Sequence, residues 1–160
     1  MEIFIMRHGH AEPEAAQDSL RVLSASGRIE VQNAIETNLP SFAGLQKVIH
    51  SPYVRAQQTA EIALQSFHEV DVAQSDLLVP NGSVQNVVAY LHEVCHEQGV
   101  NSLMIVGHQP LFGSIVDELC GLEPGAHRLA TASIAAIDTE VVAVGCCQLR
   151  WMRHVLHNSF

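Results

Sequence analysis

The sequence predicts an α/β fold, a three-layer sandwich in which a mainly parallel central sheet lies between helices on both faces. Short, almost wholly apolar runs alternate along the chain with longer segments whose apolar residues recur at helical spacing. Unbroken apolar runs are typical of strands that are buried on both faces, as in parallel sheets. Two β-rich runs follow one another near the C-terminus with no helix between them, so we expect an antiparallel addition there.

The first strand is expected at residues 3–6, a short apolar run at the start of the chain. A polar loop follows, and then a helix over about 26–39 whose apolar residues form one stripe. Ser24 is suited to cap the start of this helix, and Pro40 helps to end it.

The second strand is expected at residues 46–50, and it leads directly into Ser51 and Pro52. A serine followed by a proline is typical of a helix start, since proline suits the first helical position. We therefore expect a second helix from this pair to about Phe67, followed by a short extended piece near 70–72.

A third helix is expected to open at residues 81–83 and to be stopped by Gly99. Another buried strand follows at 102–106, and a further helix ends near Gly121. The two β-rich runs at the end of the chain are 133–137 and 141–152.

Length and composition indicate a single globular domain spanning residues 1–160. Hydrophobic residues make up 48% of the chain and charged residues 16%, and no apolar run approaches the roughly 20 residues that span a bilayer. The start of the chain does not resemble a secretory signal, so we expect a cytoplasmic protein with no membrane partner. The net charge of −9 argues against nucleic acid as a partner. The four cysteines show no CxxC spacing, and we expect them to be reduced and structural.

Basic side chains follow three of the expected parallel strands at the point where each strand ends. Arg7 and His8 follow the first strand, Arg55 lies one helical turn after the second, and His108 follows the strand at 102–106. Ligands of such sheets gather beyond the carboxyl ends of the strands. We therefore expect these four side chains to converge at one edge of the sheet.

This set of residue types predicts a phosphate or other oxyanion in the site and phosphoryl-transfer chemistry without a metal or other cofactor. Guanidinium groups match phosphate oxygens with two parallel donors, and helix N-termini add backbone N–H groups. A histidine in such a site can attack phosphorus, while a second histidine stabilises charge or moves a proton.

Three motifs carry a resemblance that spans nearly the whole chain. Residues 7–9 read RHG, residues 51–60 read SPYVRAQQTA, and residues 106–108 read VGH. In this combination they resemble the histidine phosphatase (phosphoglycerate-mutase-like) superfamily and imply its fold. The resemblance implies that His8 is the nucleophile that becomes phosphorylated. It also implies that Arg7, Arg55 and His108 hold the phosphoryl oxygens.

A secondary pattern, Asp-x-x-Arg-x-Leu, occupies residues 18–23 and resembles the short-chain members of that superfamily that act on phosphohistidine. The resemblance implies that Arg21 contacts the substrate and that Asp18 orients a proton or a partner. A simple ion pair between two loop residues explains the pattern equally well. Whether Asp18 or a water molecule would supply the proton to the leaving group stays open.

A glutamate that many members use to protonate an alcohol leaving group has no counterpart in residues 77–82, which read LLVPNG. A phosphorylated imidazole leaves with little help from an acid, because its free pKa lies near neutrality. We therefore expect hydrolysis of phosphohistidine on a partner protein, a phosphotransfer or phosphocarrier domain. The alternatives are a phosphomonoesterase for a small metabolite and a phosphohistidine-binding module without turnover.

One competing motif is HExxH at residues 92–96, the pattern of zinc proteases. Two histidines one turn apart would need a cleft and a third ligand to hold a catalytic zinc. Glu118 is a candidate by its distance along the chain, but we place it on a separate surface helix and expect no metal.

Overall fold

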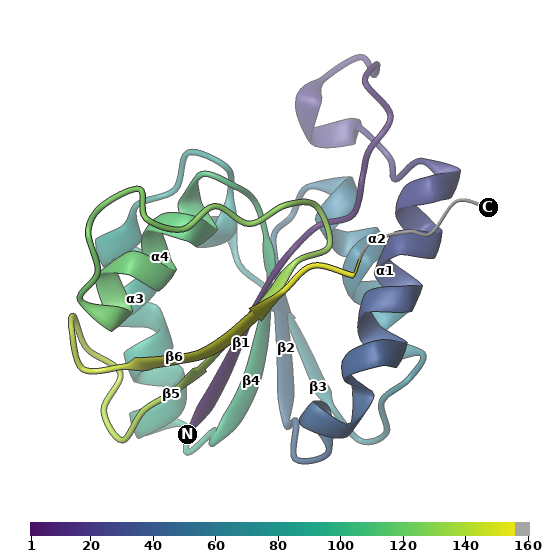
Figure 1. Cartoon of the computed structure of the whole chain (residues 1–160). Coiled ribbons are helices and arrows are strands. Elements are labelled where there is room, and N and C mark those ends of the chain that lie inside the picture. The colour runs from purple at the N-terminus through teal and green to yellow at the C-terminus, as the bar shows by residue number, and fades with distance from the viewer. Residues whose placement is uncertain (156–160) are drawn as a thin grey trace.

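The computed structural model describes residues 1–155, and within them six strands form one sheet (Figure 1). Their order is β3-β2-β4-β1-β5-β6. The pairs formed among β1, β2, β3 and β4 are parallel, whereas β5 runs antiparallel to both β1 and β6. The predicted mainly parallel sheet with an antiparallel addition is therefore confirmed. The strands are β1 (Glu2–Arg7), β2 (Lys47–His50), β3 (Asp71–Gln74), β4 (Ser102–Gly107), β5 (Ile134–Asp138) and β6 (Gln148–Arg153).

The helices cover both faces of the sheet, as a three-layer sandwich requires (Figure 1). On one face lie α1 (Ala25–Asn38) and α2 (Val54–Leu64), and on the other lie α3 (Val84–His92) and α4 (Leu111–Cys120). Among residues 1–155 no helix combines the length and apolar character needed to cross a membrane.

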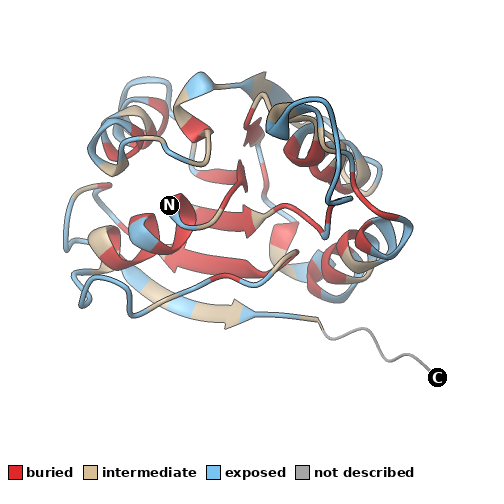
Figure 2. Ribbon diagram, turned by 90° about the horizontal axis from the view of Figure 1, so that it is seen from above, coloured by how far each residue is buried: buried red, intermediate tan, exposed pale blue. Residues whose placement is uncertain are grey.

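Alternation along β1 divides the core into two halves. Ile3 and Ile5 point toward α3 and α4, whereas Phe4 and Met6 point toward α1 and α2. All four are buried, because side chains of successive strand residues point to opposite faces and both faces are covered. Figure 2 shows this burial in the middle strands and on the inner sides of the helices, while β6 at the edge has only exposed and intermediate residues.

Two of the helix starts follow from serine caps. The Ser24 hydroxyl accepts a hydrogen bond from the backbone N–H of Gly27 at the start of α1, as predicted. Ser83 caps α3 in the same way through the N–H of Asn86.

The predicted start of the second helix is wrong. Helix α2 begins at Val54 with Tyr53 as its N-cap, and Ser51 and Pro52 lie outside it. The Ser51 hydroxyl is bonded to His108, a residue that the local sequence does not bring near it. The helix also ends at Leu64, three residues before the expected end.

Two further boundaries differ from the predictions. The third helix keeps α-helical form only to His92 and continues as a π-helical turn, η4 (Glu93–Glu97). The run expected to be β from residue 141 is a loop as far as 147. Its backbone has partners other than a strand: Val142 is bonded to two histidine side chains, and the N–H of Cys147 donates to the carbonyl of Leu119.

Candidate functional site

The carboxyl ends of β1, β2 and β4 meet at the top of the sheet and bring the predicted residues together. Arg7 pairs with Gly107 in the register of β1 and β4, so His8 and His108 leave the sheet side by side. Ser51 leaves β2 beside them, since its backbone N–H donates to Val106 on β4. The ring centroids of His8 and His108 lie 5.1 Å apart.

His8 is buried, with 6% of its surface exposed, and both of its ring nitrogens are engaged. Its Nδ1 lies 2.6 Å from the carbonyl oxygen of Gly9, and because a carbonyl only accepts, Nδ1 carries the proton. Its Nε2 then has a free lone pair, which accepts the Nε–H of Arg55 at 3.2 Å. Burial, followed by the charges of Arg55 and Arg7, lowers the pKa of His8 to about 4, although its bond to Gly9 acts in the opposite direction. His8 is therefore a neutral imidazole with its unprotonated nitrogen turned toward Arg55.

Gly9 allows the close packing that holds His8. A Cβ atom at this position would lie 2.6 Å from Cγ2 of Val31 and 2.7 Å from the carbonyl oxygen of Gly27, too close for any side chain. The N–H of Gly9 donates to the hydroxyl of Thr59, which donates in turn to the carbonyl of Arg55. This chain of bonds fixes the end of β1 against α2.

Arg55 lies on the first turn of α2 and reaches across the site. It is 5% exposed. Its Nη1–H donates to the backbone carbonyl of Asp18 at 2.7 Å, and its Nη2–H donates to the carboxylate of the same residue at 3.2 Å. Its Cζ lies 5.0 Å from the ring centroid of Tyr53, which also packs edge-on against His108 at 5.0 Å. Arg55 thus has a fixed position with its Nε–H aimed at His8.

Arg7 is only partly satisfied by the protein. Its Nη1–H donates to the carbonyl of Leu129 at 2.9 Å, whereas its buried Nε has no hydrogen-bond partner among residues 1–155. Burial lowers the pKa of Arg7, the charge of Arg55 adds to this, and Glu30 opposes it. A buried N–H without a hydrogen-bond acceptor is energetically unfavourable. We therefore expect a bound group to accept a hydrogen bond from Arg7.

His108 is 1% exposed and, like Arg7, has a buried nitrogen atom that makes no hydrogen bond within residues 1–155. Its Nε2 lies 2.7 Å from the hydroxyl of Ser51, but its buried Nδ1 has no hydrogen-bond partner in the part of the chain that the structure describes. Burial, then the neighbouring His8 and Arg55, lowers the pKa of His108 to about 2. Both histidines of the site are therefore neutral when no anion is bound.

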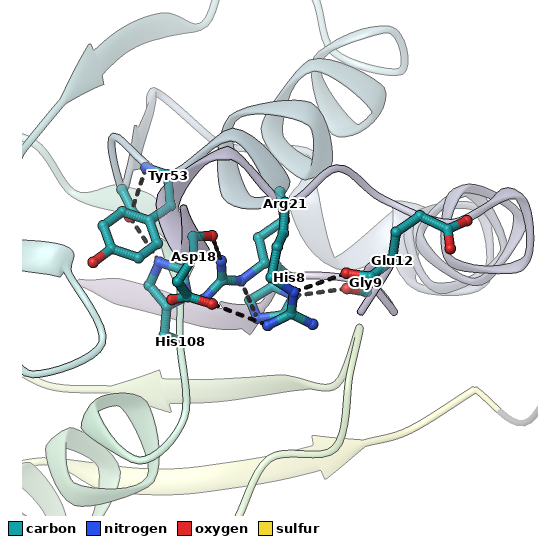
Figure 3. Close-up of polar contacts among 9 residues, drawn as sticks. His8, Gly9, Glu12, Asp18, Arg21, Tyr53 and His108 are labelled. Atoms are coloured by element: carbon teal, nitrogen blue, oxygen red, sulfur yellow. Dashed lines mark hydrogen bonds and ion pairs between the residues drawn. The ribbon is translucent and has the colours of Figure 1, made fainter. Parts of the chain in front are cut away.

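Asp18 and Arg21 form the rim of the site above His8 (Figure 3). The Nη1–H of Arg21 donates to the Asp18 carboxylate at 3.1 Å, and its Nε–H donates to the carbonyl of Glu12 at 2.8 Å. Partial burial acts to raise the pKa of Asp18, but the hydrogen bonds and charges of Arg21 and Arg55 outweigh it and lower that pKa. The loop ion pair considered from the sequence is thus present, and it extends to Arg55.

The sequence did not indicate two of the residues that shape this site. The Ser51-Pro52 pair by itself predicts only a helix start, and no local pattern indicates a role for Tyr53, although it lies in the same motif. The backbone of Tyr53 donates to the Ser51 hydroxyl at 3.2 Å, so the two residues act on His108 together. The presence of both within the ten-residue motif at 51–60 was the available signal.

One carboxylate, that of Asp18, is bonded to Arg55 beside the two histidines. The segment 77–82 brings none, and the adjacent Asp76 is exposed. Within residues 1–155 no three His, Cys, Asp or Glu side chains are grouped so that they could hold a metal ion. The histidines of the HExxH motif have another use: His92 Nδ1 lies 2.9 Å from the carbonyl of Val142, and His96 Nε2 accepts the N–H of the same residue at 3.0 Å. Glu118 lies on α4, a helix separate from the one that carries HExxH, as predicted, although it borders the same hollow as His92.

Comparison with known proteins gives consistent matches. A family model described as the histidine phosphatase superfamily (branch 1) matches residues 3–79. The chain is 37% identical over 145 residues to the phosphohistidine phosphatase SixA of Escherichia coli (strain K12), covering 88% of this chain and 86% of that protein. It is also 37% identical over 131 residues to a SixA homolog of Haemophilus influenzae, covering 76% and 78% of the two chains.

Solved structures agree with these relatives. The protein histidine phosphatase SixA complexed with tungstate matches with a TM-score of 0.87 at 32% identity, covering 96% of this chain and 97% of that one. A SixA-type protein from Agrobacterium tumefaciens matches with a TM-score of 0.77 at 19% identity over 95% and 96% of the two chains, a likeness of fold alone.

Proposed function

Because this chain belongs to the histidine phosphatase superfamily, we propose that it hydrolyses phosphohistidine on a partner protein, with His8 as the nucleophile. The observation that carries the proposal is the state of His8. It is a neutral imidazole whose Nε2 lone pair faces the site while Nδ1 is held by a backbone carbonyl. A nitrogen in this state attacks phosphorus without first losing a proton.

The reaction proceeds in two transfers. The lone pair on His8 Nε2 forms a bond to phosphorus as the P–N bond to the partner's imidazole breaks, and that imidazole takes up a proton from water as it leaves. A water molecule then attacks phospho-His8, releasing inorganic phosphate and restoring the neutral ring. The Nε–H of Arg55 donates to this lone pair in the structure, and it donates to a phosphoryl oxygen once the lone pair is bonded to phosphorus.

Three further side chains would hold the phosphoryl oxygens: Arg7, Arg55 and His108. The unpartnered Nε of Arg7 and the unpartnered Nδ1 of His108 support these roles, because each is a buried polar atom that a phosphoryl oxygen would satisfy. Fixed donors that act on developing charge in a dry site usually supply the largest share of catalysis. A relative bound to tungstate, a tetrahedral oxyanion, is consistent with such a cradle.

The bond that is cleaved is P–N rather than P–O. Hydrolysis of an alkyl phosphate needs an acid to protonate the leaving alkoxide, whereas an imidazole leaves close to its own pKa. Asp18 is a poor acid because Arg21 and Arg55 keep it ionised, and residues 77–82 supply no carboxylate. The similar proteins of Escherichia coli and Haemophilus influenzae carry phosphohistidine phosphatase names, which agrees with this preference.

The substrate is therefore a histidine-phosphorylated protein, of the phosphotransfer or phosphocarrier class. Asp18, with 57% of its side chain exposed, and Arg21 form a rim that a folded partner would contact while its phosphohistidine enters. A small phosphorylated metabolite remains the second candidate. Hydrolysis of such a phosphate ester would have no general acid, and the small substrate would not make this contact with Asp18 and Arg21.

The test uses a phosphocarrier protein that carries a radiolabelled phosphoryl group on histidine. We expect the wild-type chain to release labelled phosphate and to form a transient labelled enzyme that is stable to base and labile to acid, as a phosphohistidine is. The His8→Ala variant should do neither, whereas His68→Ala, which changes an exposed histidine, should behave as wild type. Turnover by His8→Ala would exclude the covalent route, and faster release of phosphate from sugar phosphates would favour the metabolite phosphatase.

A further inference from the structure

We propose that Ser51 is a positioning residue that keeps the proton of His108 on Nδ1, so that this N–H is available as a donor to the phosphoryl group. The inference rests on the proposed function for the identity of the acceptor, but the tautomer itself follows from the contacts of His108 within the protein.

The contacts of Ser51 define the direction of its O–H. The residue is fully buried, so no bulk water is at hand to accept its proton. Its Oγ accepts the backbone N–H of Tyr53 at 3.2 Å and lies 2.7 Å from His108 Nε2. Among residues 1–155 that nitrogen is the one acceptor in hydrogen-bond reach of the hydroxyl, so Ser51 donates and Nε2 carries the lone pair. A neutral ring with a lone pair on Nε2 has its proton on Nδ1.

The opposite tautomer leaves two polar atoms unsatisfied. With the proton on Nε2, His108 would donate to the Ser51 oxygen, and the Ser51 O–H would have no acceptor among the described residues. The Nδ1 lone pair would then face the bound anion, where like charge repels it. Unmade hydrogen bonds of buried groups are costly, so the environment favours the Nδ1–H form.

The choice of tautomer matters because His108 is not a cation. Burial and the nearby guanidinium of Arg55 keep the ring neutral, so it has one N–H instead of two. Only the Nδ1–H form offers a donor at the nitrogen that has no protein partner. Ser51 therefore acts on catalysis through His108, without touching the substrate.

The direct test is long-range proton–nitrogen NMR of the histidine rings in the wild-type protein and in Ser51→Ala. We expect the wild-type His108 to show a protonated Nδ1 and an unprotonated Nε2. In Ser51→Ala we expect Nε2 to gain proton occupancy. A proton on Nε2 in the wild type, or an unchanged His108 in the variant, would overturn the inference.

The kinetic test uses the same variant. Ser51→Ala should lower kcat/KM by roughly tenfold, the scale of one neutral hydrogen bond, and should weaken tungstate binding to a similar extent. Ser102→Ala is the matched control: it removes another buried serine hydroxyl, which has no partner and lies at the far end of β4. We expect this control to leave kcat/KM and the His108 signals unchanged.

The experiments distinguish failure of the role proposed for Ser51 from failure of the proposed function. Loss of activity in Ser51→Ala with an unaltered His108 tautomer would assign Ser51 a merely structural role and overturn the inference. A wild-type protein that does not hydrolyse phosphohistidine, yet shows Nδ1–H and loses tungstate affinity in Ser51→Ala, would overturn the proposed function and leave the role of Ser51 standing.

Discussion

Arg55 donates its Nε–H to Nε2 of His8 at 3.2 Å, although the two residues are 47 positions apart in the chain. The contact links the first turn of α2 to the end of β1, and it places a fixed positive group on the lone pair that we assign to nucleophilic attack. The same guanidinium is held by Asp18 through its other two nitrogens.

Arg55→Ala is expected to lower kcat/KM for phosphohistidine by about 10²–10³-fold, as the loss of one fixed donor to an oxyanion does. Arg55→Lys should not restore activity, because a single ammonium cannot bind both Asp18 and the phosphoryl group. Steady-state kinetics with a phosphorylated carrier protein measure both effects. The exposed Arg28→Ala serves as the control, and an Arg55→Ala variant as active as that control would remove Arg55 from the site.

The stability of the protein should fall as the pH is lowered from about 7 to 5. His8 and His108 have pKa values of about 4 and about 2 in the folded protein, below the unfolded value near 6.5. The unfolded chain therefore binds protons in this range that the folded chain does not. At pH 5 each of these histidines therefore lowers the free energy of unfolding by about 2 kcal/mol relative to its value near pH 7.

Urea unfolding at the two pH values measures this loss. His108→Gln should make the unfolding free energy less dependent on pH, whereas His68→Gln should leave the dependence unchanged. An equal dependence in all three proteins would mean that His108 is not held neutral by the fold.

Asp18→Asn tests the source of the leaving-group proton. Because Arg21 and Arg55 keep the carboxylate ionised, we expect a loss of less than tenfold, of similar size for an alkyl phosphate and for a nitrophenyl phosphate. Hydrolysis of the alkyl phosphate would depend far more on a general acid than hydrolysis of the nitrophenyl phosphate, because an alkoxide is the poorer leaving group. A selective collapse of alkyl phosphate hydrolysis in Asp18→Asn would show that Asp18, and not water, is the acid.

The HExxH motif is expected to support the loop at 139–147 rather than a metal. Replacing both His92 and His96 by alanine removes the two side-chain hydrogen bonds of Val142 and should lower the unfolding free energy by about 1–2 kcal/mol. It should leave kcat/KM unchanged. Chelator treatment of the wild-type protein should likewise leave activity intact, and loss of activity with EDTA would revive a zinc site.

Sequence patterns were sufficient to predict the architecture and the four side chains that converge at the edge of the sheet. Continuous apolar runs identify strands buried on both faces, and this predicted the helix-covered sheet that the structure has. The motif at residues 51–60, together with RHG and VGH, identified the superfamily. Arg7, His8, Arg55 and His108 could be proposed from their places after the strands, because parallel strands end at one edge of a sheet.

Only the tertiary structure decided where hydrogen bonds go. Ser51 followed by proline has the local signature of a helix start, but its hydroxyl is bonded to a ring 57 positions away, and α2 begins later. The β-rich run that begins at residue 141 is a loop up to 147, because the backbone of Val142 is bonded to His92 and His96. A local sequence pattern indicates the burial and capping preferences of a few neighbouring residues. The partner of a polar group, and with it the tautomer of each histidine, depends on distant residues that only the folded chain brings within 3 Å or so.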